Sequence, residues 1–372
     1  MKLSVTKWFA VGLLALLCLG SSFVLAQGVT TAAINGKVTS TTGEVLPGAN
    51  IIAVHNPTGT TYGTASREDG RFNLQGLRVG GAYTITVSFV GYKQAQRDDI
   101  YLQLSQNLEA NFALVEQAIE VSGVTVTSER NAVMSSARTG ASMSVSRDQL
   151  EAIPTISRNF ADAIKMSPLF VGYNAGGRNS KFNNIQIDGA VFNDLFGLSG
   201  TGQPGGGIGT SISLDALQEF QVVIAPFDVR QGGFTGGGIN AITRSGTNKL
   251  TGSAYYYAQN QDFRGTSPDE LKLKLANYTD YTVGFRVGGP VIENKLFFFA
   301  NGEVRRRTDP VTRIFGAASN ATNQYALKVD SLNKFINILK GKYGYDPGSY
   351  TDITDENPLN KIFARLDYNL SQ

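Results

Sequence analysis

Cys18 and His55 are the only cysteine and the only histidine in this chain of 372 residues, and their isolation limits the chemistry that the protein can perform. Zinc sites and histidine-based proton relays combine several such side chains, so one histidine supports neither. A single cysteine cannot form a disulfide within the chain. We therefore expect no catalytic site, no bound metal and no cofactor, and hence no enzyme.

Glycine is the other residue type whose clusters could suggest chemistry, since the chain contains 42 glycines. A phosphate-binding loop would need a Gly-Lys-Ser/Thr ending, or a strand–GxGxxG–helix unit, and the sequence has neither. A net charge of +3 without a block of basic residues gives no support for nucleic-acid binding. We expect the glycines to allow close backbone approach and positive φ angles instead.

Residues 1–26 have the organisation of a secretory signal peptide. Lys2 and Lys7 precede an apolar run at residues 8–19, and Val24-Leu25-Ala26 forms a cleavage site. The alternative is a membrane anchor, but the run is shorter than the roughly 20 residues that span a bilayer. Cleavage would leave 31 basic residues against 30 acidic ones, because Lys2 and Lys7 are removed from the 33 basic residues.

Cys18 does not indicate a lipoprotein, because Leu17 stands where a small residue is expected. After residue 26 no run of 18 apolar residues follows, so we expect no transmembrane helix. The remaining classes are a secreted protein, a periplasmic protein and an outer-membrane β-barrel, the last being the way to span lipid without apolar helices.

Residues 30–115 predict a small β-sandwich. Short strands are expected at residues 34–39, 50–55, 71–74 and 83–90, separated by glycine-containing turns. His55 ends one strand beside Asn56 and Pro57, so we expect a surface or turn position for it rather than a ligand role. The region resembles the carboxypeptidase regulatory-like domain, which implies a transthyretin-like fold without an enzyme. The matching segments are Ile34-Asn35-Gly36-Lys37-Val38, Leu46-Pro47-Gly48-Ala49-Asn50, Asp69-Gly70-Arg71-Phe72 and Phe89-Val90-Gly91-Tyr92.

Residues 129–248 are rich in Gly and Asn and predict an α+β domain. Short helices are expected at 148–152, 158–166 and 214–220, and strands at 184–188 and 221–224. The region resembles the plug of a TonB-dependent outer-membrane receptor, and its Ser-Gly-Thr-Asn ending (residues 245–248) is similar to the Oar-like branch. The signature residues that carry the resemblance are Asp188, Gly189, Glu219, Gly237, Gly238 and Asn240.

The linker at residues 116–128 stands where this family carries a TonB box. Apolar and small polar residues alternate there, and an extended segment of this kind can add to the edge of a partner's sheet. The residues that match by position are Glu120, Val121, Ser122, Gly123, Val124, Thr125 and Val126. The alternative is an ordinary first strand of the plug.

Residues 249–372 predict the first strands of a transmembrane antiparallel β-barrel. Apolar and polar residues alternate at 281–288 and 362–370, and less cleanly at 252–263 and 296–305. Alternation alone also fits a soluble multidomain β protein. The connections favour the barrel, because one short turn at 289–295 lies between two long connections. Arg305, Arg306 and Arg307 would lie at the outer rim, as a solvated loop cluster or as ligands for lipid phosphates.

The fold class expected is therefore mainly β: a transthyretin-like sandwich, an α+β plug and an incomplete barrel. Four strands cannot close a barrel, so we expect the sequence to be the N-terminal part of a longer protein, with the barrel truncated here.

The resemblance implies a substrate-gated receptor in the outer membrane of a Gram-negative cell, with its N-terminal domain in the periplasm. Its partners would be TonB with the inner-membrane energising complex, an extracellular ligand of unknown identity, outer-membrane lipid and, as a further option, a surface lipoprotein. The rival function is a component of adhesion or protein secretion that uses the barrel without energy-coupled uptake.

Two predicted loops of the plug are the candidates for contact with a ligand at its apex. Their residues are Asn174, Arg178, Asn179, Phe192, Asn193 and Asp194. For Arg178 and Asp194, pairing between the plug and the barrel is an equally good interpretation.

Overall fold

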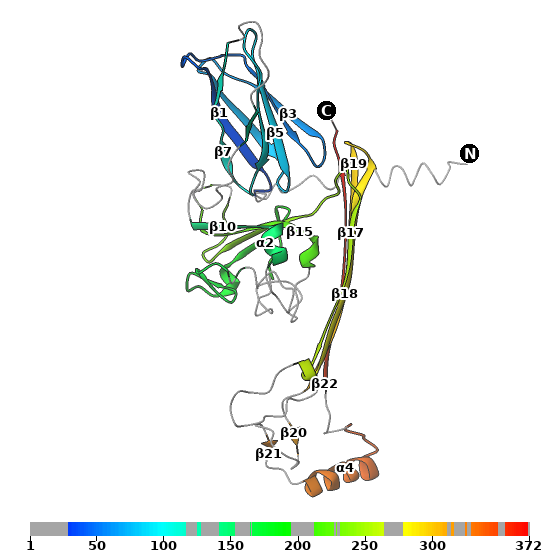
Figure 1. Ribbon diagram of the computed structural model, residues 1–372. Helices are drawn as coiled ribbons and strands as arrows, with labels where there is room; N and C mark the ends of the chain where they lie inside the picture. The colour runs from blue at the N-terminus through cyan, green and yellow to red at the C-terminus, as the bar shows by residue number, and fades with distance from the viewer. Residues whose placement is uncertain are drawn as a thin grey trace, which may run out of the picture.

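The computed structural model contains three β-structured parts, which Figure 1 shows as an upper sandwich, a central sheet and a long curved sheet. The structure describes residues 29–116, 125–127, 141–152, 164, 166–194, 212–226, 228, 231–263, 278–310, 314–315, 324–325, 329–348 and 354–370. The predicted signal peptide, residues 120–124 of the predicted TonB box and most of the predicted helix at 158–166 lie outside these residues.

The sandwich (residues 29–116) consists of two sheets with a shared apolar core. One sheet contains β4 (Arg71–Leu77), β1 (Ala32–Ser40), β7 (Asn107–Glu109) and β8 (Phe112–Leu114). The other has the order β3 (Thr60–Ala65), β2 (Asn50–His55), β5 (Ala82–Ser88), β6 (Ala95–Tyr101) and β9 (Thr125–Thr127). Alternate residues of these strands, such as Ile34, Ile51 and Ile85, are completely buried between the sheets, as period-two alternation requires.

The four strands expected in the sandwich are present as β1, β2, β4 and β5, whereas β3 and β6 were not predicted. β3 reads Thr-Thr-Tyr-Gly-Thr-Ala and β6 reads Ala-Gln-Arg-Asp-Asp-Ile-Tyr. Neither has the apolar alternation of a half-buried strand. Their pairing with the buried strands β2 and β5 makes them strands.

The central sheet occupies the region of the predicted plug and has the order β10 (Ala141–Ser146), β15 (Leu217–Ala225), β16 (Gly238–Thr243), β13 (Asn184–Ile187) and β14 (Ala190–Val191). A short hairpin joins β11 (Phe170–Val171) to β12 (Asn174–Ala175), and helix α2 (Arg147–Ala152) follows β10. The apolar core beneath the sheet includes Phe220, Val222 and Ile239.

The helix expected at residues 214–220 is mostly wrong. A single 3₁₀ turn, η2 (Leu214–Ala216), is capped by the Ser213 hydroxyl, and β15 then begins at Leu217. The residues of β15 pair with β10 on one side and with β16 on the other. Two ladders of backbone hydrogen bonds therefore override the local helical pattern.

The long sheet contains β17 (Thr251–Asn260), β18 (Thr279–Ile292), β19 (Leu296–Pro310) and β22 (Thr354–Tyr368), paired antiparallel in chain order. One face exposes apolar side chains such as Phe285, Ile362 and Leu366, while Asn301 and Glu303 are buried on the opposite face. This arrangement confirms the predicted alternation. Figure 1 shows the sandwich and the central sheet lying along one side of this sheet.

Between β19 and β22 lie β20 (Ile314–Phe315), β21 (Gln324–Tyr325) and helix α4 (Val329–Tyr343), which was not predicted. Another 3₁₀ turn, η3 (Gln261–Phe263), ends β17. Figure 1 shows α4 at the end of the long sheet that is remote from the sandwich. No helix among the described residues is both long and apolar enough to cross a membrane.

The interpretation of residues 305–307 as a solvated loop cluster is wrong, because all three arginines lie within β19. The guanidinium of Arg305 is buried and donates to both carboxylate oxygens of Asp280 on β18, at 2.8 and 2.5 Å. Arg307 donates to Asp309 at 2.6 and 2.9 Å. Since Asp280 on the neighbouring strand and Asp309 on the same strand hold these charges, they are not presented to lipid phosphates.

Candidate functional site

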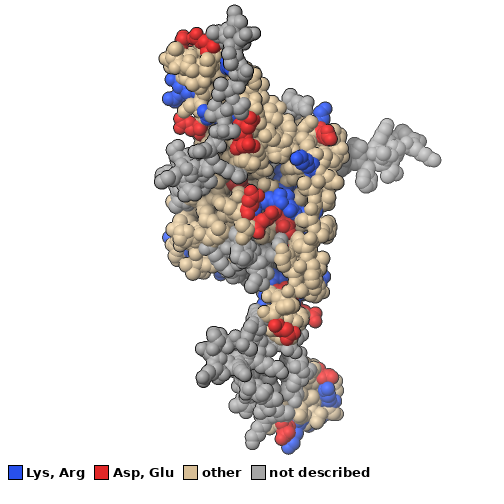
Figure 2. Space-filling view, in the orientation of Figure 1, with Lys and Arg blue, Asp and Glu red and all other residues tan. Residues whose placement is uncertain are grey.

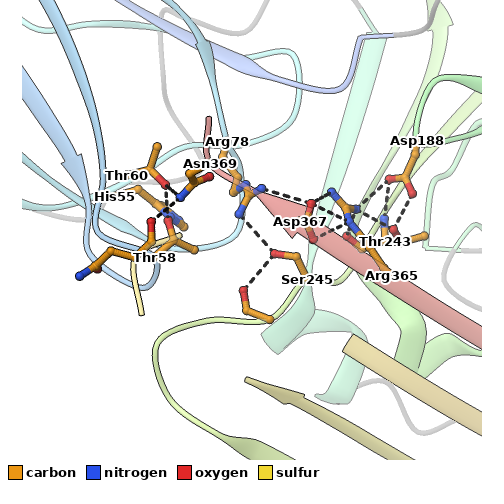
Figure 3. A network of polar contacts seen from close by, with 12 residues as sticks. His55, Thr58, Thr60, Arg78, Asp188, Thr243, Ser245, Arg365, Asp367 and Asn369 are labelled. Carbon is orange, nitrogen blue, oxygen red and sulfur yellow. Dashed lines mark hydrogen bonds and ion pairs between the residues drawn. The ribbon is translucent and has the colours of Figure 1, made fainter. Parts of the chain in front are cut away.

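The described parts of the chain meet at a polar junction centred on Arg365 of β22 (Figure 3). One side of its guanidinium donates to Asp367 on the same strand, at 2.8 to 3.0 Å. The Nη1 group donates to the carbonyl oxygen and the hydroxyl of Thr243, at 3.1 and 2.8 Å. Thr243 ends β16, so this one side chain connects the long sheet to the central sheet.

Asp188 provides the carboxylate on the central-sheet side of the junction. It follows β13 with a φ of 49°, a left-handed conformation that Asp tolerates better than most residues. Because β13 runs parallel to β16, the ends of both strands meet, and Asp188 accepts from the amide and the hydroxyl of Thr243 at 2.9 and 2.5 Å. Its Oδ1 lies 3.5 Å from Nη1 of Arg365.

The sandwich joins the junction through Arg78, which lies just after β4. Its Nη2 is 3.3 Å from Oδ1 of Asp367, and its Nη1 is 3.5 Å from the Ser245 hydroxyl. Beside it, Asn369 donates to the hydroxyl of Thr60 at 3.1 Å. The arginines at positions 78 and 365 therefore share one carboxylate, and the sandwich, the central sheet and the long sheet are held together by polar contacts.

His55 lies close to this junction and is buried, which corrects the expected surface position. Its Nδ1 is hydrogen-bonded to the hydroxyl of Thr58 at 2.7 Å, and its ring contacts that of Tyr83. The turn position expected for it is correct, since the amide of Thr58 also donates to the carbonyl of His55. Burial, with a smaller contribution from the charge of Arg78, lowers the pKa of His55 to about 4.

Glu303 of β19 makes a second connection between the long and central sheets. Its carboxylate accepts from Lys361 of β22 and from Tyr255 of β17, both at 2.7 Å. It also accepts at 2.8 Å from the hydroxyl of Ser213, the residue that caps η2. Three hydrogen-bond donors offset the cost of burying this carboxylate. The group therefore ties the start of β15 to the inner face of the long sheet.

Glu219 of β15 makes the main contact between the central sheet and the sandwich. It is 4% exposed, and its Oε1 accepts from the amide of Leu104 at 2.8 Å and from the hydroxyl of Ser144 at 2.5 Å. Gln221 donates to the carbonyl of Leu104 at 3.2 Å. Burial raises the pKa of Glu219, although the two donors oppose that shift.

The other residues of the predicted plug signature have mainly structural positions. Gly189 has a φ of 82°, and a side chain at Gly237 would collide with the ring of Phe170. Gly238 begins β16 beneath the ring of Phe234. Asn240 is buried and its Nδ2 donates to the carbonyl of Val29, so this residue also connects β16 to the sandwich.

Three of the six candidates for ligand contact shape their own loops. Asn174 accepts from the amide of Ser180, Asn179 caps η1 (Ser180–Phe182), and Asn193 accepts from the amide of Ile185. Phe192 packs partly buried against the core of the central sheet.

The two charged candidates have different surroundings. Arg178 is exposed, with its guanidinium 5.9 Å from the ring centre of Phe182. Asp194 is half-buried and has a polar partner. The two belong to separate loops, and the described contacts do not join those loops into one site.

Within the described residues, no group of three or more His, Cys, Asp or Glu side chains is arranged to hold a metal ion. The junction can hold its parts together and release them, since its contacts are hydrogen bonds and ion pairs. Figure 2 shows basic and acidic side chains grouped midway along the molecule, where the central sheet meets the long sheet.

Sequence reasoning missed Arg78, Glu303, Lys361, Arg365 and Asp367. The last three lie on β22 at inward positions that alternate with outward-facing, mostly apolar residues, and this alternation is visible in the sequence. A charged residue that faces inward on a strand needs a partner. That signal could have indicated a contact with another part of the chain, although it could not have indicated which part.

Two segments match known domain families. Residues 33–115 match the carboxypeptidase regulatory-like domain, and residues 242–368 match an outer membrane beta barrel domain. Among curated proteins, the chain is 27% identical over 248 residues to the TonB-dependent transporter Oar of Myxococcus xanthus. That match covers 59% of this chain but only 22% of the relative, so the chain spans about a fifth of the relative's length.

Solved structures with some similarity include a siderophore receptor and an outer membrane transporter. The siderophore receptor PirA of Pseudomonas aeruginosa is 18% identical with a TM-score of 0.34, over 46% of this chain and 30% of its own. The outer membrane transporter YddB of Escherichia coli is 12% identical with a TM-score of 0.42, over 62% and 31% of the respective chains.

The family matches confirm the predicted resemblance to Oar-like TonB-dependent receptors and the predicted fold class. They also confirm the predicted localisation in the outer membrane. The relatives named above are transporters and receptors rather than enzymes.

Proposed function

We propose that this chain, as part of an Oar-like TonB-dependent receptor of the outer membrane, gates passage through a barrel by moving a plug that TonB pulls. In this proposal the central sheet is the plug, the long sheet belongs to the barrel wall, and the sandwich lies in the periplasm. The function requires no covalent chemistry. Its partners are TonB with the inner-membrane energising complex, an extracellular ligand and outer-membrane lipid.

The observation that carries the proposal is the way in which the central sheet is held. The described connections of the plug region to the long sheet include the Arg365 junction, the contact of Glu303 with Ser213, and an ion pair of Glu151 on α2 with Arg286 on β18 at 3.6 Å. Each sheet keeps its own ladders of hydrogen bonds, and the central sheet has its own apolar core. When the two sheets separate, water can replace the lost polar contacts. Separation therefore costs less free energy than exposing an apolar interface would, which suits a part that must move.

The ligand would act at the end of the plug formed by the predicted apical loops. Arg178 is the preferred candidate, because it is exposed and charged, whereas the exposed Asn174 and Asn179 accept hydrogen bonds from their own loop. Binding there would bias the plug toward a state in which the segment at residues 120–126 is free. TonB would then pair with this segment as an added strand.

The decisive experiment deletes residues 120–126 from the protein and measures binding of the periplasmic domain of TonB, together with energy-dependent uptake in cells. Loss of both, with normal amounts of protein in the outer membrane, is the expected result. Retention of TonB binding and of activity would contradict energy coupling. It would favour the rival function in adhesion or protein secretion.

A further inference from the structure

We propose that the edge of β6 in the sandwich is the resting dock of the TonB-box segment, so that the sandwich and TonB compete for the same strand. The inference rests on the proposed function, because it adds a regulator to the box assumed there. β9 (Thr125–Thr127) is the last strand of the sandwich sheet and runs parallel to β6. Two of its three residues, Thr125 and Val126, belong to the predicted box.

The register of the pairing is defined. Gln96 is opposite Thr125, Arg97 is opposite Val126, and Asp98 is opposite Thr127. On its other side β6 pairs antiparallel with β5. Without β9, β6 would be the edge strand of its sheet, and an edge strand presents unpaired N–H and C=O groups to any extended segment.

The side chains of β6 at these positions are engaged within the sandwich. Asp98 accepts from the hydroxyl of Thr84 on β5 at 2.8 Å, and Gln96 donates to Asp98 at 2.9 and 3.0 Å. The guanidinium of Arg97 lies 4.6 Å from the ring centre of Phe112 and donates to the carbonyl of Asn111 at 2.5 Å. These contacts hold β6 in place as a template for an added strand.

The chain also leaves the sandwich at the same place. The amide of Lys93 donates to the carbonyl of Val115 at 2.8 Å, and Tyr92 forms a β-bridge with Glu116. These contacts lie just before β6 begins at Ala95. The segment that follows residue 116 therefore starts beside the edge with which β9 pairs, and docking there needs no movement of the sandwich.

Docking of this kind lowers the apparent affinity for TonB, because TonB can bind only the fraction of molecules in which the box is free. The described ladder is short and parallel, and parallel pairing is slightly less stable per residue than antiparallel pairing. A partner that pairs with a longer stretch of the segment can therefore displace β6. The sandwich would thus keep an idle receptor from engaging TonB.

The test locks the pairing with a disulfide between opposite residues, Gln96→Cys with Thr125→Cys, in the protein purified from outer membranes. If β6 shelters the box, the oxidised form binds the periplasmic domain of TonB at least tenfold more weakly than the reduced form. Equal or tighter binding by the oxidised form would overturn the proposal, since β9 would then offer its outer edge to TonB while docked. Failure of the two cysteines to join under oxidising conditions would also overturn it.

Two controls separate the dock from other effects. A disulfide between Val54→Cys and Thr61→Cys joins opposite residues of β2 and β3, away from β9, and should leave TonB binding unchanged. The Thr125→Cys variant alone measures the effect of altering the box. Deletion of residues 120–126 in the same assay separates the two proposals. If deletion has no effect, the proposed function fails, whereas if deletion abolishes binding and the lock does not weaken it, only the dock fails.

Discussion

At the scale of single residues, this protein depends on polar groups, some buried and some partly exposed, whose partners come from distant parts of the chain. Arg365 contacts Thr243 and Asp188, and Glu219 contacts Leu104. His55 is one exception, because its Nε2 is buried and no partner for it is described. Its neutral form is therefore the one that the fold accommodates, and it makes the local structure sensitive to acid.

The pKa of His55 is lowered from 6.5 to about 4 in the folded state, so between these values the unfolded chain binds the proton more readily. The stability that depends on a neutral His55 is complete above pH 6.5 and is lost as the pH falls to about 4. The loss should reach roughly 3 kcal/mol. Hydrogen exchange of core amides in β2 and β5, corrected for intrinsic rates, measures it. The His55→Gln variant should lose most of this dependence, and an unchanged profile would contradict the assignment.

Replacement of Arg365 by Met should loosen the junction by about 1.5–3 kcal/mol, since it removes the charged hydrogen-bond donor shared by Asp367 and Thr243. Exchange of the Thr243 amide should then accelerate. Arg365→Lys should have an intermediate effect, because an ammonium group cannot donate to both sides as a guanidinium does.

The matched control for this variant is Arg71→Met, which removes the exposed pair between Arg71 and Asp69. An exposed pair contributes about 1 kcal/mol or less, so little change is expected. Equal effects of the two arginine variants would show that the junction does not hold the sheets together.

At the scale of elements, the strands of the long sheet separate two environments. Apolar side chains cover one face, and charged and polar side chains on the other face contact the central sheet. β18 and β19 are joined by a short turn in which Asn294 has a φ of 60°. If the apolar face meets lipid, a charge on it should cost most at the middle of a strand and least near the strand ends.

Phe285 lies at the middle of β18, and its side chain is exposed on the apolar face. Phe285→Arg should cost about 2–4 kcal/mol in a bilayer, whereas Val291→Arg, near the end of the same strand, should cost about 0–1 kcal/mol. The amount of heat-modifiable, folded protein in the outer membrane measures the difference. Equal tolerance of both substitutions would show that this face does not meet lipid.

At the scale of the whole molecule, contacts among the described residues fasten the sandwich to the other two parts at several places. These include the junction of Arg78 with Asp367, the contact of residues 104–105 with β15 and Gln231, and the hydrogen bond from Asn240 to Val29. Ile242 of β16 also packs into the apolar core of the sandwich. Movement of the central sheet must therefore strain or release the sandwich.

Glu219→Ala should release one of these fastenings, because the amide of Leu104 loses its acceptor. A hydrogen bond contributes roughly 0.5–1.5 kcal/mol between neutral groups and more when one group is charged, so exchange of the Leu104 amide should accelerate by about 2- to 10-fold or more. Glu219→Gln keeps an oxygen at the same place and should preserve most of the protection. If both variants exchange alike, the carboxylate does not hold the sandwich.

An element could be predicted from the sequence where the residue pattern that specifies it lies within a few neighbouring residues. β2 begins and ends at the predicted residues because its apolar alternation lies within six residues. β15 was partly mistaken for a helix, and α4 was not expected, because neighbouring strands and a long connection decide those regions. Among the site residues, the glycines and the asparagine of the plug signature could be recognised in the sequence by their type and order. The partners of Asp188 and Glu219 could not be recognised in this way.

The sequence by itself determined the class of fold: a mainly β chain with a sandwich of short strands, a glycine-rich middle region and long alternating strands. These properties depend on composition and on short-range periodicity, which the chain carries locally. Only the tertiary structure decided that His55 is buried, that Arg78, Arg365 and Asp188 meet at one junction, and that β9 pairs with β6. Each of these depends on contacts between residues far apart in the chain, and such contacts exist only once the sheets have packed.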